Sequence, residues 1–554
     1  MSVFCGVVGL SGQNVEREGL DLEKKFVDQC TEKQITTKIN VGNVVVMSID
    51  IGAHSSQYDE NDDIITIIAG DPVVREVSDD VSADLNLLNS ASNEELLLAL
   101  LMKSRGVFAG ISINKVTNSV YIYTDKSGIR PIFYSINNDV LIFSSLMSVI
   151  QQTTLISLEY DELGVLETMA FGYCLANKTI YKNIKRLNQG EIISLNERGL
   201  EFQTYWDWSN VSVDKNIDIP NMYKEFKEAI ALRSEGKEKA VAFLSGGMDS
   251  RAITAQLNES FDELHTFNFA TERSLDGECA KLFAEKAGIH FHEKTFKELA
   301  YPNWGQLIAD GIYEKDLGRI KKVWSGDGGS VGVGCVYLDD KMITLLENNE
   351  IDTAIKYFIH KTKSNIPENI LLRTQRKDAM SRFIDGIRKE FVENKEDPGK
   401  AIYYFLMNND QKRHLQHHFE TICEHEIEFL LPFFDANFLE KTYSTPIREM
   451  LYHRVYCKWF DFFPASSRSV PWQTYPEHIP CPVELPEGLS NQWSTTRKIS
   501  LNTRWFDVKS YLSIKNKDNI HLVMDRNKLM IATVLHILFV KDYSHIFRKI
   551  RRLK

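Results

Sequence analysis

The stretch Lys239-Ala-Val-Ala-Phe-Leu-Ser-Gly-Gly-Met-Asp-Ser-Arg251 decides the fold of the second half of the chain. Its apolar first part, residues 239–244, is typical of a buried parallel strand. The two glycines that follow permit a tight turn, and residues 249–257 then show a helical pattern. A strand, a glycine turn and a helix N-terminus together present backbone amides and a partial positive charge to an anion. The stretch therefore predicts a phosphate-binding loop in an α/β domain.

Polar side chains in this loop suit a nucleotide. Ser245 and Ser250 supply hydroxyl donors, whereas Asp249 would repel phosphate and instead suits a Mg²⁺ ion that bridges phosphates. The string Ser-Gly-Gly-x-Asp-Ser resembles the pyrophosphate loop of the ATP pyrophosphatases, which cleave ATP between its α and β phosphates, and it lacks the Gly-Lys-Ser/Thr ending of a Walker loop. The resemblance implies that the following residues bind ATP, with Asp249 as the metal ligand: Leu244, Ser245, Gly246, Gly247, Asp249 and Ser250. The alternative is an ordinary βα turn that contains two glycines.

The composition is that of a globular chain with several domains. The 554 residues are 43% hydrophobic and 25% charged. A net charge of -11 argues against nucleic acid as a partner. The eight cysteines form no CxxC pair, so neither a zinc site nor a disulfide framework is indicated. Because no signal peptide opens the chain and no apolar run is long enough to span a bilayer, we expect a cytoplasmic location.

The first 208 residues are rich in predicted strands. A leucine-rich helix is expected at 94–102, and the strands are expected at 1–10, 44–51, 64–69, 106–113, 119–125 and 140–144, with a hairpin after 180. Five strings resemble, in the same order, strings of the asparagine synthetase family: Gly106-Val-Phe-Ala, 125–134, Phe143-Ser-Ser, Asn188-Gln-Gly-Glu and Tyr205-Trp206. The resemblance implies that residues 1–208 form a class II glutamine amidotransferase-like domain with an α+β N-terminal-nucleophile-hydrolase-like fold.

Three departures from the family pattern affect the expected glutaminase. Cys5 matches the nucleophile, whose own α-amino group is the base in that family, but Ser2-Val3-Phe4 precede it here. Ala69 stands where the family has an asparagine that donates to the oxyanion, although Asp71 keeps an acid nearby. No arginine for the glutamine carboxylate lies at 45–51. We therefore expect slow or no glutamine hydrolysis unless a propeptide is removed. The alternative to a nucleophile is that Cys5 is simply a small, buried hydrophobic residue.

Residues 220–500 are expected to form the ATP-binding domain, after a linker at 209–219. Strands at 263–271 and 291–296 around a helix at 279–288 indicate an α/β doubly wound parallel-sheet fold of the ATP-pyrophosphatase type. The family resemblance assigns backbone contacts with adenine to Phe269 and an acidic position just before the helix to Asp276.

A second glycine-rich stretch, 323–334, resembles another ATP-binding loop of the family. The resemblance places Ser325 and Gly326 at ATP and makes Asp327 the essential acid. Ser330-Val331 replaces an acidic pair of which one member helps to bind Mg²⁺ in the family. A plain glycine-rich βα loop is the alternative, but two such loops at strand ends are what a nucleotide site needs.

Three further features bear on the substrate. The stretch 429–435 resembles a family signature, whose aspartate, here Asp435, helps to order the site, and a helix is expected after it at 451–463. At 470–475 the family's lysine, which stabilises charge on phosphorus, is missing, and nearby Arg468 is not a like-for-like substitute. The segment 296–324 is short and lacks the Thr-rich loop that recognises aspartate. We therefore expect that aspartate is not the preferred carboxylate.

Residues 501–554 are predicted to be a C-terminal helical basic tail, with a helix at 529–540 and a basic amphipathic end. We expect a solvated or domain-packed end, with a peripheral membrane contact as the alternative. As a whole, the sequence predicts an AMP-forming amide ligase that uses ATP and Mg²⁺ to join a small-molecule carboxylate to ammonia or an amine, with glutamine as one nitrogen source. The alternatives are a true glutamine-hydrolysing asparagine synthetase and a nucleotide-binding scaffold. The oligomeric state stays open, with a homodimer among the options.

Overall fold

The computed structural model describes residues 2–30, 34–54, 57–75, 81–234, 236, 238–296, 303–376, 378–491, 501–514 and 517–553. Spatial contacts divide the chain into two compact units. Unit 1 comprises Met1–Ile156, Leu187–Leu338 and His414–Ser494, and unit 2 comprises Ser157–Arg186, Asp339–Arg413 and Thr495–Lys554. Both predicted domains contribute to unit 1, and the boundaries at 208, 220 and 500 remain predictions.

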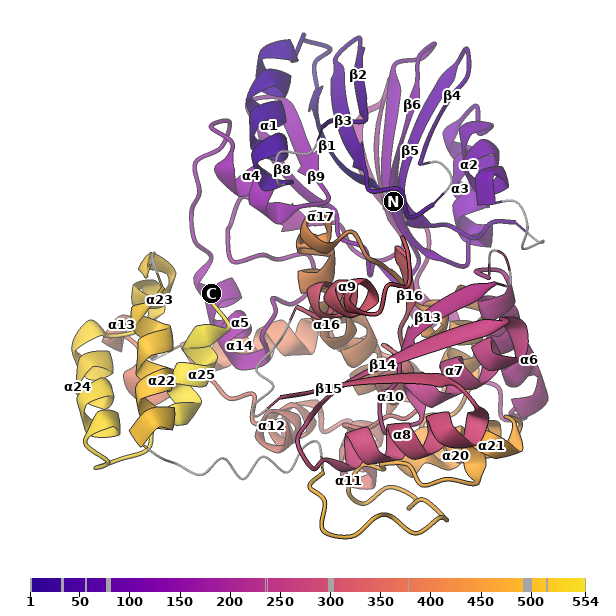
Figure 1. Cartoon of the computed structure of the whole chain (residues 1–554). Helices are drawn as coiled ribbons and strands as arrows, with labels where there is room; N and C mark the ends of the chain where they lie inside the picture. Colours follow the sequence, from indigo (N-terminus) through magenta and orange to yellow (C-terminus); the bar gives the residue numbers. More distant parts are fainter. Residues whose placement is uncertain are drawn as a thin grey trace. The chain divides into compact units, whose positions relative to one another are not determined.

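Two antiparallel sheets form the N-terminal part of unit 1 (Figure 1). Within unit 1 the first sheet runs β8-β9-β1-β3-β2, and the second runs β12-β11-β7-β6-β5-β4. The strands of the first sheet are β1 (Ser2–Gly9), β2 (Thr37–Val41), β3 (Val44–Asp50), β8 (Phe133–Asn137) and β9 (Val140–Ser144). Those of the second are β4 (Tyr58–Glu60), β5 (Ile64–Asp71), β6 (Val107–Asn114), β7 (Ser119–Thr124), β11 (Glu191–Asn196) and β12 (Gly199–Thr204).

Apolar side chains from both sheets share one core. Alternate residues such as Phe4 and Val46 of the first sheet and Ile67 and Ile111 of the second belong to the same buried cluster. Helix α1 (Glu16–Gln29) packs on the first sheet, and α2 (Val81–Asn89), which is followed by α3 (Glu94–Lys103), packs on the second. This order of helix, sheet, sheet and helix confirms the predicted α+β N-terminal-nucleophile-hydrolase-like fold.

The second part of unit 1 is built on a parallel sheet in the order β15-β14-β13-β16-β17, in which every paired strand is parallel. Its strands are β13 (Lys239–Phe243), β14 (Glu263–Thr271), β15 (His290–Phe296), β16 (Lys322–Trp324) and β17 (Glu428–Leu430). The chain moves outward in one direction from β13 to β15 and in the other direction from β16 to β17. The strand order therefore reverses between β13 and β16, and ligands of open α/β sheets bind at such a point. This confirms the predicted doubly wound fold.

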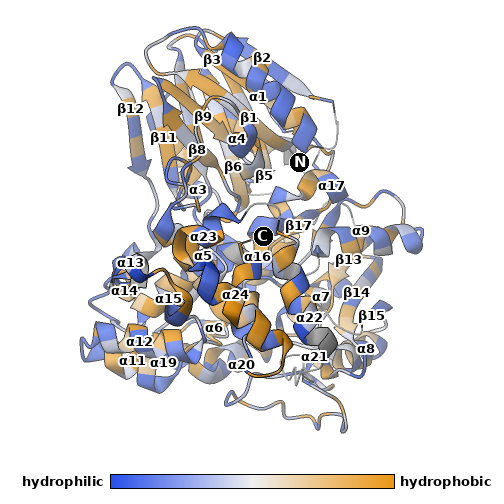
Figure 2. Cartoon of the chain, turned by 90° about the vertical axis from the view of Figure 1, so that its left-hand side faces the viewer, coloured by the Kyte–Doolittle hydropathy of each residue, from blue (hydrophilic) through white to orange (hydrophobic). Residues whose placement is uncertain are grey.

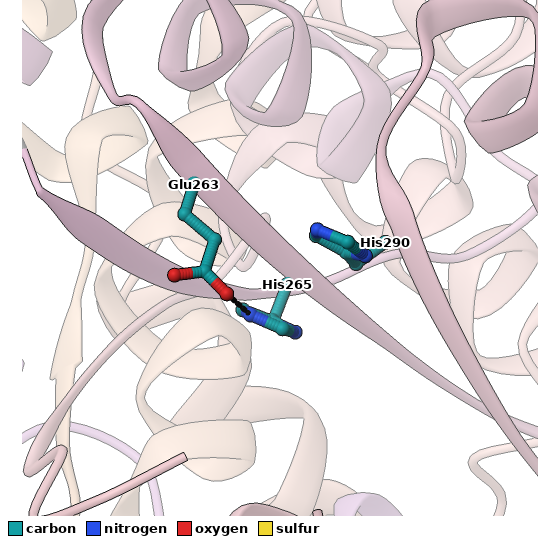
Figure 3. A group of neighbouring side chains, drawn as sticks. All are labelled: Glu263, His265 and His290. Atoms are coloured by element: carbon teal, nitrogen blue, oxygen red, sulfur yellow. Dashed lines mark hydrogen bonds and ion pairs between the residues drawn. The ribbon is translucent and has the colours of Figure 1, made fainter.

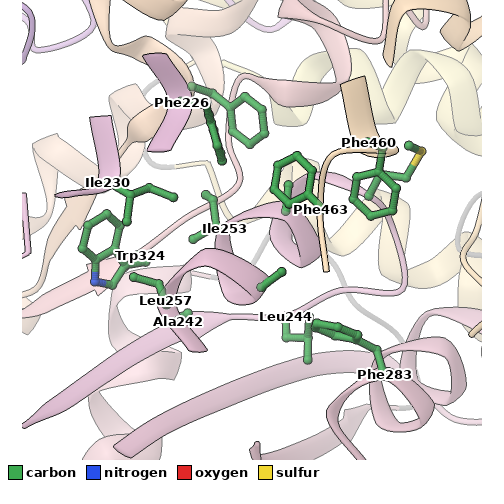
Figure 4. Packing of buried hydrophobic residues seen from close by; sticks show 14 of the residues in the cluster. Phe226, Ile230, Ala242, Leu244, Ile253, Leu257, Phe283, Trp324, Phe460 and Phe463 are labelled. Atoms are coloured by element: carbon green, nitrogen blue, oxygen red, sulfur yellow. The ribbon is translucent and has the colours of Figure 1, made fainter. Parts of the chain in front are cut away.

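Helices flank the parallel sheet and carry its hydrophobic core. The longer helices of this part include α6 (Ile219–Ala231), α7 (Asp249–Ser260), α8 (Leu275–Ala287), α9 (Trp304–Glu314), α18 (Ala436–Ser444) and α20 (Arg454–Phe460). Figure 4 shows Phe226 of α6, Ile253 of α7 and Phe463 after α20, which belong to the same buried cluster as Leu244 after β13. Full burial of side chains of this size stabilises the fold by about 1.5–3 kcal/mol each. This core holds the first turn of α7 against the end of β13.

Two predicted helix starts were wrong, one because of a side-chain cap and the other because of the backbone conformation. Helix α8 begins at Leu275 rather than 279, since the Ser274 side chain caps it by accepting from the Gly277 amide. Asp276 consequently lies inside the first turn of α8 and not before it. The predicted helix at 451–463 is interrupted, because Tyr452 and His453 have positive φ values of 58° and 66°, so α20 starts at Arg454.

Unit 2 is mostly helical. Its longer helices are α5 (Glu162–Phe171), α11 (Asp340–Glu347), α12 (Ile351–Lys361), α14 (Ala379–Lys389), α22 (Leu501–Leu512), α24 (Arg526–Ile537) and α25 (Ser544–Arg551). The helix predicted at 529–540 is α24, which starts earlier because the Asp525 side chain caps the Asn527 and Lys528 amides. Figure 2 shows hydrophobic residues along α24, of which Met530 and Val534 are exposed. Among the residues that the structure describes, no helix is long and apolar enough to cross a membrane.

Candidate functional site

The two glycine-rich loops meet at the carboxyl ends of β13 and β16. A Cβ atom on Gly326 would lie 2.8 Å from the Ser250 amide nitrogen, and one on Gly329 would lie 2.6 Å from Asp249 Oδ1. Real Cβ contacts are not this short, so glycine is required where the second loop touches the start of α7. The sequence predicted that the loops converge, and the structure brings them into direct contact at the point where the strand order reverses.

The two serines of the first loop hold its shape. Ser250 Oγ accepts a hydrogen bond from the Ser245 amide at 2.8 Å and lies 2.9 Å from Ser245 Oγ. The Gly247 amide in turn donates to Ser245 Oγ at 3.3 Å. These bonds close the turn between β13 and α7, so the predicted hydroxyl donors also order the loop backbone.

A buried carboxylate supports the loop from behind. The Gly246 amide donates to Asp276 Oδ1 at 3.1 Å, and Asn268 Nδ2 donates to Asp276 Oδ2 at 3.0 Å and to the Leu244 carbonyl at 2.8 Å. Burial raises the pKa of Asp276. A Cβ on Gly246 would lie only 2.8 Å from Asp276 Cα. Asn268 was not predicted from the sequence, although a buried amide in the apolar run 263–271 is an unusual signal.

Asp249 and Asp327 form the acidic part of the site. The Tyr456 hydroxyl donates to Asp249 Oδ1, and Ser325 Oγ donates to Asp327 Oδ2 at 2.6 Å. Burial, with a further contribution from the charge of Asp327, raises the pKa of Asp249 to about 7 even though the Tyr456 hydrogen bond opposes the shift. Two mutually repelling carboxyl groups beside a phosphate-type loop fit an oxygen-liganded Mg²⁺ ion, which would relieve the repulsion. Tyr456 is a site residue that the sequence did not reveal.

A buried arginine fastens the segment at 467–473 to α7. The Arg251 guanidinium donates to three backbone carbonyls of this segment, those of Ser467, Val470 and Pro471, at 3.1, 3.1 and 2.8 Å. The same segment contacts the first loop, because the backbone N–H of Gln473 donates to the Gly246 carbonyl at 2.8 Å. Arg251 therefore holds the segment that contacts the first loop.

Two other predicted residues lie close to the site. Phe269 is buried near the end of β14, with its ring centroid 6.2 Å from those of Phe243 and Trp304. Arg468 donates to the Phe463 carbonyl at 3.3 Å and lies 3.6 Å from Asp461. The adenine contact of Phe269 and the replacement of the missing lysine by Arg468 remain predictions.

Cys5 lies in the middle of β1, where it is paired with Met47 of β3 and Ser144 of β9. The residues before it continue the strand, its exposed fraction is 0%, and burial raises the pKa of its thiol well above the usual value. Strand alternation puts Cys5 on the face opposite Phe4, whereas Ala69 belongs with Phe4 to the core between the sheets. The structure therefore does not bring Cys5 and Ala69 to a common open site.

The polar residues around Gly70 are engaged in buried ion pairs. Arg75 Nη1 lies 3.1 Å from Asp71 Oδ1, and Arg130 Nη2 donates to both carboxylate oxygens of Glu428 at 2.8 and 2.9 Å. A Cβ on Gly70 would lie 3.0 Å from Arg130 Nε. Arg130 therefore lies beside Gly70, although the sequence has no arginine at 45–51 for the glutamine carboxylate. Its guanidinium is paired with the Glu428 carboxylate of β17.

Asp435 joins the antiparallel and parallel parts of unit 1. It accepts hydrogen bonds from Arg105 Nη2 at 3.0 Å and from Arg233 Nη1 at 2.9 Å, and it caps α18 through the Asn437 amide at 3.1 Å. The side chain is fully buried, so both guanidinium groups compensate its charge. These contacts order the junction of the two parts, and the role in ordering the ATP site that the family signature implies remains a prediction.

Comparison with known proteins agrees with this architecture. A model of the glutamine amidotransferase domain matches residues 76–206, and a model described as asparagine synthase matches residues 221–310. The two domain models and the relatives described below support a divergent member of the asparagine synthetase family. The amidotransferase match begins after Cys5 and Ala69.

Three relatives share modest sequence identity with this chain. Asparagine synthetase (glutamine-hydrolyzing) 3 of Bacillus subtilis is 27% identical over 180 residues, which cover 30% of this chain and 29% of that protein. Asparagine synthetase (glutamine-hydrolyzing) 1 of the same organism is 25% identical over 266 residues, or 46% and 40% of the two chains. A putative asparagine synthetase (glutamine-hydrolyzing) 2 of Methanocaldococcus jannaschii is 26% identical over 251 residues, or 40% and 48%. The matches thus span less than half the length of these relatives.

Proposed function

We propose that this asparagine synthetase family member is a cytoplasmic, ATP-dependent, AMP-forming amide ligase. It joins a small-molecule carboxylate to ammonia or an amine. The observation that supports this proposal is the contact of two glycine-rich loops, with Asp249 and Asp327 beside them, at the reversal point of a parallel sheet.

The proposed reaction has two steps. In the first, a carboxylate oxygen of the substrate attacks the α phosphorus of ATP, the bond to the β-phosphate oxygen breaks, and pyrophosphate leaves with the bonding electrons. In the second, the amine nitrogen attacks the acyl carbon, AMP leaves, and the nitrogen loses a proton. Bound Mg²⁺ would neutralise charge on the departing pyrophosphate.

Each part of the site has a role in these steps. The loop after β13 and the N-terminus of α7 bind the pyrophosphate oxygens through backbone amides. Asp249 and Asp327 would hold the cation, and Ser325 orients Asp327 through its 2.6 Å hydrogen bond. Tyr456 and Asn268 are positioning residues that act through Asp249 and Asp276.

The nitrogen reaches this site as ammonia or an amine in our proposal, and Cys5 does not hydrolyse glutamine. Cys5 is buried within a continuous strand, and its nitrogen is an amide that cannot serve as the base. We further propose that the carboxylate is not aspartate, because the segment that would recognise it is short.

A glutamine-hydrolysing asparagine synthetase is a second candidate. It is favoured by the amidotransferase match at 76–206 and by the names of the relatives. A nucleotide-binding scaffold is favoured instead by Ser330-Val331, which replaces an acidic pair, and by Gln473 near the place of the missing lysine.

Pyrophosphate release separates the three candidates. The full chain is incubated with Mg²⁺ and ATP, with a panel of carboxylates, and with ammonium, primary amines or glutamine as nitrogen source. A ligase releases pyrophosphate with ammonium or an amine and yields no glutamate from glutamine. Glutamate production would support the synthetase candidate, whereas thermal stabilisation by Mg²⁺ and ATP without any pyrophosphate release across the panel would support the scaffold.

A further inference from the structure

A cluster of histidine and glutamate side chains lies at the amino end of the parallel sheet, away from the glycine-rich loops. Glu263 and His265 belong to β14, and His290 begins β15 (Figure 3). One potential ligand atom from each of the three lies within 4.8 Å of the other two. The loops follow the carboxyl ends of the strands, so this cluster is separate from the proposed nucleotide site.

The sheet geometry brings the three residues together. Glu263 and His265 are two positions apart in one strand and share a face, while His290 is the direct neighbour of His265 in the parallel register. The rings of His265 and His290 are nearly parallel, with centroids 4.7 Å apart and an interplanar angle of 13°. Rigid backbone pairing thus holds two imidazoles and a carboxylate in one place without contributions from a loop.

The contacts of His265 favour a metal ligand with a supporting partner. Its Nε2 faces Glu263 Oε1 at 2.6 Å, and its Nδ1 faces His292 Nε2 at 2.9 Å. At 2.6 Å a proton lies between Nε2 and Oε1, so a cation would take the place of this proton as the two side chains move apart, and Nδ1 would then donate to His292. Hydrogen bonding of the second ring nitrogen is the usual way in which a protein orients a metal-bound histidine.

The accessibility of these side chains also fits an exchangeable ion. The His265 side chain is 7% exposed and that of Glu263 is 40% exposed, so one ligand is anchored in the sheet and another faces solvent. His290 is exposed as well, which leaves room for water as a further ligand. Lys239 lies 3.3 Å from Glu263 Oε2, the carboxylate oxygen that does not face His265.

We propose that Glu263, His265 and His290 bind a divalent transition-metal ion of the Zn²⁺ type and thereby link the edge strand β15 to β14. Two imidazole nitrogens and one carboxylate oxygen form a ligand set suited to Zn²⁺, Co²⁺ or Ni²⁺, whereas Mg²⁺ prefers oxygen ligands. His292 is a positioning residue for His265. The site serves the sheet and does not depend on the proposed ligase reaction.

Titration of the full chain with Co²⁺ in the presence of excess Mg²⁺ tests the proposal directly. We expect one high-affinity Co²⁺ ion per chain, with visible absorption bands of a nitrogen- and oxygen-liganded ion that are lost when Zn²⁺ is added. Zn²⁺ should also raise the melting temperature of the wild-type protein. Absence of both binding and stabilisation in the wild-type protein would overturn the proposal.

Variants assign the ion to this cluster. His290→Gln and Glu263→Gln change side chains that are at least partly exposed, and each should weaken binding by about tenfold to a hundredfold, as should loss of the positioning partner in His292→Gln. His360→Gln, at an exposed histidine of α12, is the matched control and should bind Co²⁺ like the wild type. If His290→Gln and His360→Gln bind equally well while circular dichroism shows both to be folded, the ion is held elsewhere and the assignment is wrong.

Discussion

The surroundings of Asp249 and those of Cys5 are two regions in which this chain keeps the order of its family's motifs, and they differ in accessibility. Around Asp249, two loops leave the ends of parallel strands and touch through glycines, with a partly buried acid pair between them. Around Cys5, the corresponding residues lie within paired strands, and the thiol has no exposed surface. The fold is present in both regions, and in our proposal only the first acts as a site.

The physical difference lies in where the backbone hydrogen bonds are used. In β1, the residues on both sides of Cys5 are paired with neighbouring strands, so the chain there is an interior part of the sheet. At the ends of β13 and β16, the loops leave the sheet, and the N-terminus of α7 begins with amides that have no partner within the helix. If our proposal is correct, the amidotransferase-like fold persists here although its glutaminase site has been lost.

Loss of the Asp249 carboxylate should have the largest effect. In Asp249→Asn, pyrophosphate release should fall by at least about 10²-fold, a typical loss when an electrostatic group of the reaction is removed. Asp262→Asn, at an exposed acid of the same domain, should retain wild-type turnover. Steady-state pyrophosphate release measures both variants, and equal rates would show that Asp249 has no metal role.

Replacing a glycine by alanine should affect activity in the region of Asp249 and only stability in the region of Cys5. Gly326→Ala forces a Cβ to within 2.8 Å of the Ser250 amide and should reduce pyrophosphate release by about tenfold to a hundredfold, if about 1–3 kcal/mol of strain acts at the site. Gly70 has a φ of +105°, and a Cβ there would overlap the Val107 carbonyl oxygen, so Gly70→Ala should lower the melting temperature.

Rates normalised to the folded fraction, which circular dichroism reports, decide this comparison. Gly70→Ala should keep the wild-type rate per folded molecule when ammonium or an amine supplies the nitrogen. A large loss in that rate would mean that the region around Gly70 contributes to the reaction after all.

The binding of Mg²⁺ and ATP should weaken as the pH falls. The pKa of Asp249 is raised to about 7, so the carboxyl is increasingly protonated below this value and a proton must leave before the cation binds. The apparent dissociation constant should therefore rise by up to about tenfold for each pH unit below about 7. Because the folded state holds this proton more tightly than the unfolded state, the ligand-free protein should also lose stability as the pH rises from about 4 to about 7.

Calorimetric titration with Mg²⁺ and ATP, together with urea unfolding, measures both trends. In Asp249→Asn this group no longer titrates, so its contribution to the pH dependence of stability should vanish. Affinity that is constant between about pH 6 and about pH 8 would contradict the raised pKa.

Replacement of Cys5 should have the smallest effect on the ligase reaction. Cys5→Ala should leave pyrophosphate release with ammonium or an amine unchanged, because the thiol is buried in β1, in the antiparallel part of unit 1 and not in the parallel sheet. It should lower stability modestly, through the loss of a buried sulfur atom. Glutamate formation from glutamine should be at background in both proteins; glutamate that disappears in Cys5→Ala would show that the glutaminase is active.

The sequence by itself determined the fold class and pointed to most residues of the proposed nucleotide site. Local patterns sufficed for this, because an apolar run followed by Ser-Gly-Gly-Met-Asp-Ser can form little else than a strand, a tight turn and a helix N-terminus. The same local information predicted β1, β14 and α3 nearly to the residue. It misplaced the start of α8, where a serine cap outweighed the hydrophobic pattern.

Only the tertiary structure decided which distant residues support the site. Tyr456 reaches Asp249 across 207 positions of the sequence, and Arg251 reaches the Pro471 carbonyl across 220 positions. The cluster of Glu263, His265 and His290 likewise depends on the register of two strands, and its members carry no sequence motif. Contacts of this kind arise from the packing of whole elements, and no local pattern encodes which side chains that packing brings together.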